Sequence, residues 1–385
     1  MTDCELYIHI PFCVKKCHYC DFASYANASC FISDYISLLI SEASWMSEAV
    51  SCASFTSIYV GGGTPSLIPP HEWKRLFEGL SSILDLSKVK EFTAEGNPDS
   101  ISSQWLDAVI STGVNRISLG MQSSVDSELK TLGRIHSQTQ TEKAVRLVHD
   151  SGIVNLNLDL MFGFPGQTPE SWKNTLSCAL TFDPEHISAY GLIPEEGTVM
   201  YDRIRSGAVT LPDENIERSM YDLAKMKLRQ AGFVQYEISN FSKPGYACQH
   251  NIGYWNHTPY LGIGCSAASM LPAGTSPFSC MRFTNPRDLA SYKALVENRD
   301  SALREQENVS AAEARFETMM LGLRMVSGVS EEHFYRLHGI SLEDCYGAKL
   351  RQQEKLGFVK HENASWKLTD KGMDCQNAVL VELME

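Results

Sequence analysis

The chain has 385 residues, enough for about two or three domains. Its formal net charge of −13 argues against a nucleic-acid-binding protein, because contacts to phosphates require clustered Lys and Arg. No apolar run approaches the roughly 20 residues that span a bilayer, the N-terminus lacks a secretion signal, and nothing indicates contact with a membrane surface. We therefore expect a cytoplasmic protein that binds no nucleic acid.

In chain order, β-rich runs alternate with stretches of helical periodicity over the first half of the sequence. The runs lie at 6–10, 57–61, 91–96, 116–122, 155–163 and 186–192. Helical stretches between them lie at 30–49, 71–86, 102–113 and 139–152. This alternation predicts βαβ units and a parallel sheet. Six units without an obvious seventh and eighth favour an α/β fold with an open, partial (β/α)6 barrel.

The predicted strands end in residues that carry chemistry. Their ends read PFC, GGGTP, EGNPD, GMQS, DLMFGFPGQT and YGLIPEEGT. In parallel α/β barrels, ligands bind at the C-terminal rim of the strands. We therefore expect these polar ends to converge on one enlarged ligand site.

The pattern changes after about Asp202. A predicted helix from about Pro212 to Gly232 leads into an aromatic-rich segment, and mostly helical sequence follows from about Ala311. It closes with a predicted hairpin over 358–372 and a last helix, which resembles a winged-helix module. The expected parts are a barrel over 1–240, a connecting segment over 241–305 and a helical, winged-helix-like domain over 306–385.

Three cysteines, Cys13, Cys17 and Cys20, lie together directly after the first predicted strand. Three thiolates on one loop can bind one face of an iron–sulfur cubane, because soft sulfur suits iron. A [4Fe–4S] cluster normally takes four cysteines, so three leave one iron open to a small molecule with amino and carboxylate groups. The alternatives are a zinc site with His18 as a fourth ligand, or a chance group of thiols.

A glycine-rich segment, GGGTP at 61–65, follows the second predicted strand. Glycines let the backbone approach a ligand closely, although such turns also form for conformational reasons alone. The segment lacks the Lys-Ser/Thr ending of a phosphate-binding loop.

The Cys-x3-Cys-x2-Cys loop, the preceding Tyr-Ile-His-Ile-Pro-Phe and the GGGTP segment together resemble the radical S-adenosylmethionine (SAM) superfamily. More narrowly, they resemble the branch that contains oxygen-independent coproporphyrinogen III oxidase and the HemW-like haem chaperones, over nearly the whole chain. The resemblance implies a [4Fe–4S] cluster on the three cysteines, with SAM on its open iron. It implies SAM contacts at Tyr7, Gly62, Gly63, Thr64, Glu95, Gln122, Arg134 and Asp159.

Some of these residues have other interpretations. Arg134 could form a surface ion pair, and Gln122 could close a turn. Asp159 indicates a functional role even without the family resemblance. A carboxylate in an apolar strand is energetically costly unless it has a partner or a ligand. The implied chemistry is one-electron reduction of SAM to methionine and a 5′-deoxyadenosyl radical. The sequence leaves open whether SAM is cleaved or only bound.

Two departures separate the chain from the oxidase pattern. Phe22 stands where the oxidase places a further cysteine, and Tyr7 lies almost at the start, without the oxidase's N-terminal extension. Conversely, residues 250–255 match the His-Asn-x-x-Tyr-Trp motif of HemW-like proteins. A neutral His250 suits haem iron as an axial ligand, and the two aromatics offer flat apolar surface.

Other interpretations of this segment remain. His250 could bond its neighbours while the aromatics plug the barrel mouth, and Cys248 and His257 are further candidate ligands. We expect a haem chaperone that binds haem and passes it to an acceptor protein. The alternatives are a radical decarboxylase acting on coproporphyrinogen III and a radical SAM enzyme with an unrelated substrate. The expected function also requires an electron donor, which the sequence does not identify.

Overall fold

The computed structural model describes residues 2–51, 53–272 and 280–384. Within these ranges, twelve strands form one sheet, in the order β14-β13-β12-β11-β1-β4-β5-β6-β7-β8-β10-β9. The six strands expected from the sequence are neighbours in this sheet and run parallel. They are β1 (Thr2–Ile10), β4 (Ala53–Gly62), β5 (Glu91–Gly96), β6 (Arg116–Gln122), β7 (Asn155–Phe162) and β8 (His186–Gly191).

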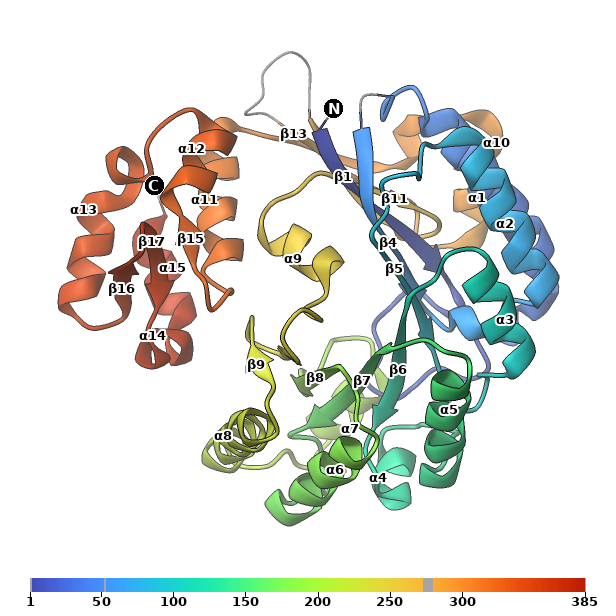
Figure 1. Ribbon diagram of the computed structural model, residues 1–385, viewed down its shortest axis with the longest axis horizontal. Coiled ribbons are helices and arrows are strands. Elements are labelled where there is room, and N and C mark those ends of the chain that lie inside the picture. The colour runs from blue at the N-terminus through green and yellow to red at the C-terminus, as the bar shows by residue number, and fades with distance from the viewer. Residues whose placement is uncertain (1, 52, 273–279, 385) are drawn as a thin grey trace.

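Helices cover the convex face of this curved sheet (Figure 1). They are α1 (Ile32–Met46), α2 (Pro70–Ile83), α3 (Ser103–Ser111), α5 (Gln138–Asp150), α6 (Pro169–Thr181) and α8 (Glu214–Gln230). The shorter α4 (Asp126–Thr131) and α7 (Val199–Arg205) follow the ends of β6 and β8. The sheet does not close on itself, because antiparallel strands flank it at both ends. The prediction of an open, partial barrel is therefore confirmed.

The segment over 241–305 supplies strands that the sequence reasoning missed. A seventh parallel strand, β11 (Tyr260–Ile263), pairs with β1. Antiparallel β12 (Ala268–Pro272), β13 (Cys280–Thr284) and β14 (Glu305–Val309) extend the sheet beyond it, and α10 (Leu289–Asn298) packs on α1. At the other end, β10 (Asn240–Ser242) and β9 (Val234–Gln235) continue from β8.

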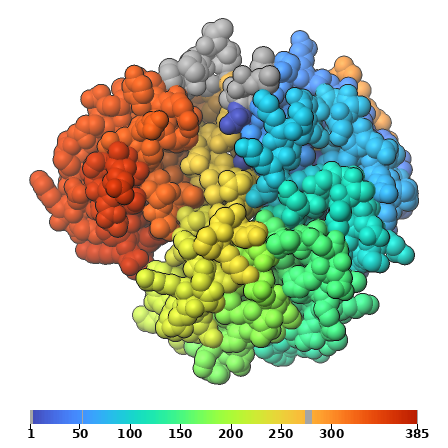
Figure 2. Space-filling model, in the orientation of Figure 1, coloured from blue at the N-terminus to red at the C-terminus, as the bar shows by residue number. Residues whose placement is uncertain are grey.

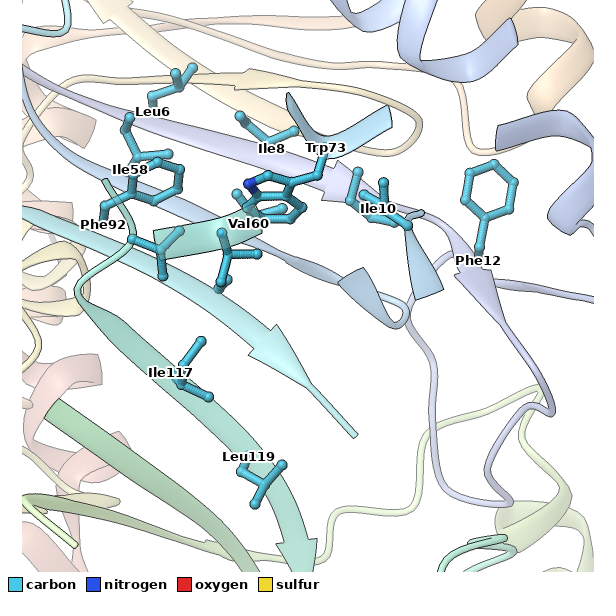
Figure 3. Packing of buried hydrophobic residues seen from close by; sticks show 14 of the residues in the cluster. Leu6, Ile8, Ile10, Phe12, Ile58, Val60, Trp73, Phe92, Ile117 and Leu119 are labelled. Atoms are coloured by element: carbon cyan, nitrogen blue, oxygen red, sulfur yellow. The ribbon is translucent and has the colours of Figure 1, made fainter. Parts of the chain in front are cut away.

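Alternation along the strands separates an apolar face from a polar one, because successive side chains point to opposite faces. Outward side chains such as Ile8, Val60 and Leu119 form the core beneath the helices, where Trp73 of α2 also packs (Figure 3). Inward side chains are mostly polar. The concave face of the barrel is therefore a polar lumen that is available to ligands.

The C-terminal residues fold beside the barrel with a core of their own, which includes Met319, Phe334, Tyr346 and Trp366. Figure 2 shows these residues as a separate lobe. Its helices are α11 (Ala311–Gly322), α12 (Glu331–His338), α13 (Leu342–Lys355), α14 (Asp370–Asp374) and α15 (Gln376–Leu383). Its sheet has the order β15 (Val329–Ser330), β17 (Ser365–Leu368), β16 (Val359–Glu362). The lobe is therefore mostly helical with a small antiparallel sheet, and its predicted bounds of 306–385 stay a prediction.

Between β10 and β11 the chain crosses the concave side of the sheet through α9 (Gln249–Trp255) (Figure 1). The Glu91 carboxylate accepts the backbone N–H groups of Gln249 at 2.9 Å and His250 at 3.0 Å, which satisfies the start of this helix. A Cβ on Gly253 would lie 1.8 Å from Oε1 of Glu5, so only glycine fits there. Helix α9 therefore fills the lumen at the amino ends of the strands. Across the described ranges, every helix is too short or too polar to cross a membrane.

Candidate cluster and SAM site

A cavity of about 500 Å³ opens at the carboxyl ends of the parallel strands, at the opposite end of the lumen from α9. This is the rim where the sequence predicted a ligand site. Ten of the twelve predicted site residues line it: Cys13, Cys17, Cys20, Gly62, Gly63, Thr64, Glu95, Gln122, Arg134 and Asp159. Tyr7 and His250 do not.

The cysteine loop forms one wall of this cavity. Its start is fixed by β2 (Phe12–Cys13), which pairs with β3 (Tyr25–Ala26). The Cys13 sulfur accepts a hydrogen bond from Thr64 Oγ1 at 3.5 Å, and the Cys17 sulfur accepts one from Arg134 Nη1 at 3.5 Å. Burial raises the pKa of the Cys20 thiol to about 11, so binding of a metal must displace its proton.

The three thiols of this loop border one cavity, whereas His18 is bonded outside it. Among the residues that the structure describes, no three His, Cys, Asp or Glu side chains converge closely enough to hold a single metal ion. The three thiols instead line a large shared cavity. His18, the fourth ligand in the zinc alternative, is hydrogen-bonded through Nδ1 to the Thr131 carbonyl at 3.0 Å.

The glycine segment lies tightly between the cysteine loop and the end of β1. Gly62 has φ +106°, and a Cβ there would lie 2.4 Å from Cε1 of His9. The backbone N–H groups of Gly63 and Thr64 donate to Ile10 O at 2.7 Å and to Phe12 O at 2.8 Å. The glycines therefore serve backbone conformation and close packing, and the same segment borders the cavity.

Two carboxylates form an acidic wall. Glu95 accepts hydrogen bonds from the Tyr59 hydroxyl at 2.8 Å and the Gly62 N–H at 3.2 Å. Burial, followed by the nearby charge of Asp159, raises the pKa of Glu95 to about 7. Asp159 accepts from Ser118 Oγ at 2.8 Å and Asn157 Nδ2 at 2.9 Å, so it has protein partners that offset its burial. This wall suits a cationic ligand.

Arg134 supplies the opposite charge. Its Nη2 donates to Asn97 Oδ1 at 2.8 Å and to the Gly120 carbonyl at 2.9 Å. These acceptors are neutral and position the guanidinium without neutralising its charge, so the arginine is not part of a simple surface ion pair. Gln122 has φ +62°, next to an irregularity in the pairing of β6 with β7. A ligand with both a cationic and a carboxylate group would meet complementary charges here.

Sequence reasoning missed several residues that line the cavity, among them Asn97, Tyr59, Ser118 and Tyr190. The two-residue alternation of side chains along a strand would have identified most of them. Tyr59 is two positions from Gly61, and Ser118 is two from Gly120, so each points to the lumen. Asn97 directly follows β5, within the EGNPD segment.

The two remaining predicted residues lie elsewhere. The Tyr7 hydroxyl bonds His9 Nδ1 at 3.0 Å, and Tyr7 borders a second cavity. His250 is 1% exposed, with Nδ1 2.8 Å from Ser57 Oγ and Nε2 3.0 Å from the Tyr254 hydroxyl. Burial, followed by the charge of a nearby arginine, lowers the pKa of His250 to about 3, so the ring is neutral. Both of its nitrogens are engaged.

Comparison with known proteins agrees with this geometry. Residues 7–179 match the model of the radical SAM superfamily, and residues 309–374 match that of the HemN C-terminal domain. The heme chaperone HemW of Bacillus subtilis is 34% identical over 374 residues, which cover 97% of each chain. HemW of Escherichia coli is 33% identical over 377 residues, 98% of this chain and 97% of that one.

A mitochondrial radical S-adenosyl methionine domain-containing protein 1 from Bos taurus is 30% identical over 383 residues, 98% of this chain and 87% of that one. The solved structure of E. coli coproporphyrinogen III oxidase (HemN) superposes with a TM-score of 0.83. It covers 100% of this chain and 90% of that one at 19% identity, which supports a shared fold alone.

The match of residues 7–179 to the radical SAM superfamily and the 30% identity to a radical S-adenosyl methionine domain-containing protein define a radical SAM protein. Within this class, sequence identity of 33–34% over nearly the full length of several relatives assigns the chain to one family. The chain belongs to the HemW family of heme chaperones.

Proposed function

We propose that this protein is a haem chaperone, which binds haem and passes it to an acceptor protein. The observation that carries the proposal is the identity of 33–34% to proteins named heme chaperone HemW, over 97–98% of this chain. The function requires two partners, a haem acceptor and an electron donor to the cluster. A cytoplasmic location stays a prediction.

The proposal includes a [4Fe–4S] cluster chelated by SAM. Cys13, Cys17 and Cys20 would hold the cluster, since they share one cavity large enough for a bulky group. Glu95 and Asp159 would face the cationic groups of SAM or its ribose hydroxyls, and Arg134 would face its carboxylate. When bound, the cluster supplies an electron for the reduction of SAM. The protein's own residues would orient SAM in the cavity.

Oxidative decarboxylation of coproporphyrinogen III is the alternative function. The likeness in fold to E. coli HemN favours it, although at 19% identity that likeness supports the fold alone. Phe22, in the position of the oxidase's further cysteine, lines the cluster cavity and is 66% exposed. An apolar side chain there supplies no additional thiol.

Haem titration of the anaerobically reconstituted protein tests the proposed function. We expect a saturable change in the Soret band with one haem per chain, and transfer of that haem to apomyoglobin as a probe acceptor. Formation of protoporphyrinogen from coproporphyrinogen under reducing conditions would favour the oxidase instead. Absence of saturable haem binding would overturn the proposal.

The cluster ligands have a separate test. Cys17→Ala should lose the visible absorption of the reconstituted cluster, because its sulfur lines the cavity. Cys30 is exposed, so Cys30→Ala is a matched control that should keep the full absorption. Equal absorption in both variants would contradict the ligand assignment.

A further inference from the structure

Asn97 lies between two residues that contact the sulfurs of the cysteine loop. It directly follows β5 and lines the cluster cavity. Its Oδ1 lies 2.8 Å from Nη2 of Arg134, and its Nδ2 lies 3.1 Å from Oγ1 of Thr64. Its backbone N–H donates to Ser66 Oγ at 3.2 Å, and its carbonyl accepts from the Ser100 N–H at 3.0 Å. The residue is therefore fixed through its backbone and through its side-chain amide.

The guanidinium of Arg134 determines the orientation of this amide. A guanidinium carries N–H donors and no acceptor, so the Asn97 atom that faces it is the carbonyl oxygen. The guanidinium is itself held in place, because its Nε donates to His136 Nδ1 at 3.3 Å and its Nη2 donates to the Gly120 carbonyl at 2.9 Å. The amide nitrogen of Asn97 therefore faces Thr64 and donates to it.

The amide of Asn97 in turn sets the direction of the Thr64 proton. Oγ1 of Thr64 accepts a hydrogen bond from Asn97 Nδ2, which leaves the single proton of the hydroxyl to be donated elsewhere. The acceptor is Cys13 Sγ, at 3.5 Å. Thr64 is 3% exposed, so little water competes for this proton. The hydroxyl therefore donates to the sulfur and does not accept from it.

Arg134 reaches a second sulfur of the same loop. Its Nη1 donates to Cys17 Sγ at 3.5 Å, while its Nη2 holds Asn97. One network of three side chains therefore donates to two of the three cysteine sulfurs, those of Cys13 and Cys17. Hydrogen bonds to the sulfurs are among the factors that set the reduction potential of an iron–sulfur cluster. They stabilise the reduced form more, because reduction adds negative charge and bonds to charged acceptors are stronger.

We propose that Asn97 is a positioning residue, which directs Thr64 and Arg134 at the sulfurs of Cys13 and Cys17 and so raises the reduction potential of the cluster. The inference rests on the cluster of the proposed function and deepens that function. In the step concerned, a one-electron reductant is oxidised and the cluster gains one electron, with no bond formed or broken. The donated hydrogen bonds stabilise the added charge.

This role differs from SAM binding, to which the family resemblance assigns Thr64 and Arg134. A contact with SAM has an effect only when SAM is present. Donation to the sulfurs instead changes the potential in the absence of SAM, because the acceptors belong to the protein. A redox titration without SAM therefore separates the two roles.

The reconstituted protein is titrated with dithionite as the reductant. Thr64→Val removes the hydroxyl and keeps the shape, so at a fixed potential we expect the ratio of reduced to oxidised cluster to fall three- to tenfold, the upper value being about 59 mV for one electron. Thr64→Ser keeps a hydroxyl and should restore the wild-type potential. Thr141→Val is the matched control, because Thr141 is buried on α5, away from the cavity. Its potential should equal that of wild type.

A second variant, Asn97→Ala, keeps both donors and removes the residue that directs them. It should also lower the potential, with the iron content of the wild-type protein. If neither Thr64→Val nor Asn97→Ala shifts the potential, the network has no such role and the cluster assignment stands. Loss of the cluster from either variant would mean that the network holds the loop in place, which also overturns the inference. If the wild-type protein forms no cluster, the cluster of the proposed function itself fails.

Discussion

The imidazole of His250 shares a hydrogen bond of 2.8 Å with the hydroxyl of Ser57, which joins α9 to β4 across 193 positions of the chain. The ring also stacks on Tyr59, with 5.2 Å between centroids. Its second nitrogen bonds Tyr254, one of the aromatics of the His-Asn-x-x-Tyr-Trp motif. In this structure, the motif therefore plugs the lumen.

His250→Ala should accordingly destabilise the fold. It removes one of the partners of the Ser57 hydroxyl and the partner of the Tyr254 hydroxyl and opens a cavity, so we expect a loss of about 2–4 kcal/mol in the free energy of unfolding. Urea denaturation measures this loss. His149 is exposed, so His149→Ala is the control and should change stability by no more than about 0.5 kcal/mol. A His250→Ala variant of wild-type stability that no longer binds haem would instead support His250 as the haem ligand.

The sequence predicted the parts of the molecule that depend on local pattern. The six parallel strands follow from period-two runs between helical stretches, and the cluster cavity follows because parallel strands end on one rim. Short strands such as β11 left too few residues for a period to show. The second cavity could not be predicted for the same reason, because its wall depends on the pairing of β11 with β1.

The position of His250 depends on contacts that no local pattern contains. Its backbone N–H is held by Glu91, 159 positions earlier in the chain, and its ring by Ser57. The motif itself was recognised, but the direction of its histidine depends on these distant partners. His257 was a competing candidate in the sequence, and its contacts with Thr318 at 3.1 Å and Glu317 at 3.3 Å likewise come from a distant helix, α11.

Glu5 should make stability depend on pH. Burial, which outweighs a hydrogen bond from Ser57, raises its pKa from 4.5 to about 9. Between these values the unfolded chain has lost a proton that the folded protein retains, so the free energy of unfolding falls as pH rises. Glu5→Gln keeps the shape and removes the titration. We expect the variant to lose less stability than wild type as pH rises through this window.

Urea denaturation at several pH values tests this expectation. The control is Glu48→Gln, because Glu48 is exposed and its variant should follow the wild-type pH dependence. Parallel curves for Glu5→Gln and wild type would show that the folded protein does not keep Glu5 protonated.

Arg134 should contribute to SAM binding through its charge. Arg134→Gln removes a guanidinium that lines the cluster cavity, and hydrogen bonds to charged groups contribute about 1.5–3 kcal/mol, so we expect SAM affinity to fall by about tenfold or more. Equilibrium binding of SAM to the reconstituted protein measures the effect. Arg146 is exposed on α5, and Arg146→Gln should bind SAM as wild type does. If Arg134→Gln loses the cluster absorption, the arginine instead supports the cysteine loop.

Two glycines allow backbone strain to be separated from close packing. Gly62 and Gly152 both have positive φ, +106° and +85°, so alanine at either position costs about 1–2 kcal/mol in backbone strain. A Cβ on Gly152 meets nothing within 4 Å, whereas one on Gly62 would lie 2.4 Å from the His9 ring. That ring cannot move freely, because its nitrogens bond the Tyr7 hydroxyl at 3.0 Å and the Ala23 carbonyl at 2.8 Å.

Gly62→Ala should therefore destabilise the protein by about 1–3 kcal/mol more than Gly152→Ala, the usual cost of overpacking. It should also weaken SAM binding, because the displaced backbone borders the cluster cavity and donates to Glu95. Gly152→Ala should leave SAM affinity unchanged, since that turn lies outside the cavity. Urea denaturation and SAM titration of both variants measure the two effects. Equal losses of stability would mean that His9 yields to the new methyl group, and that the glycine is required for its backbone conformation alone.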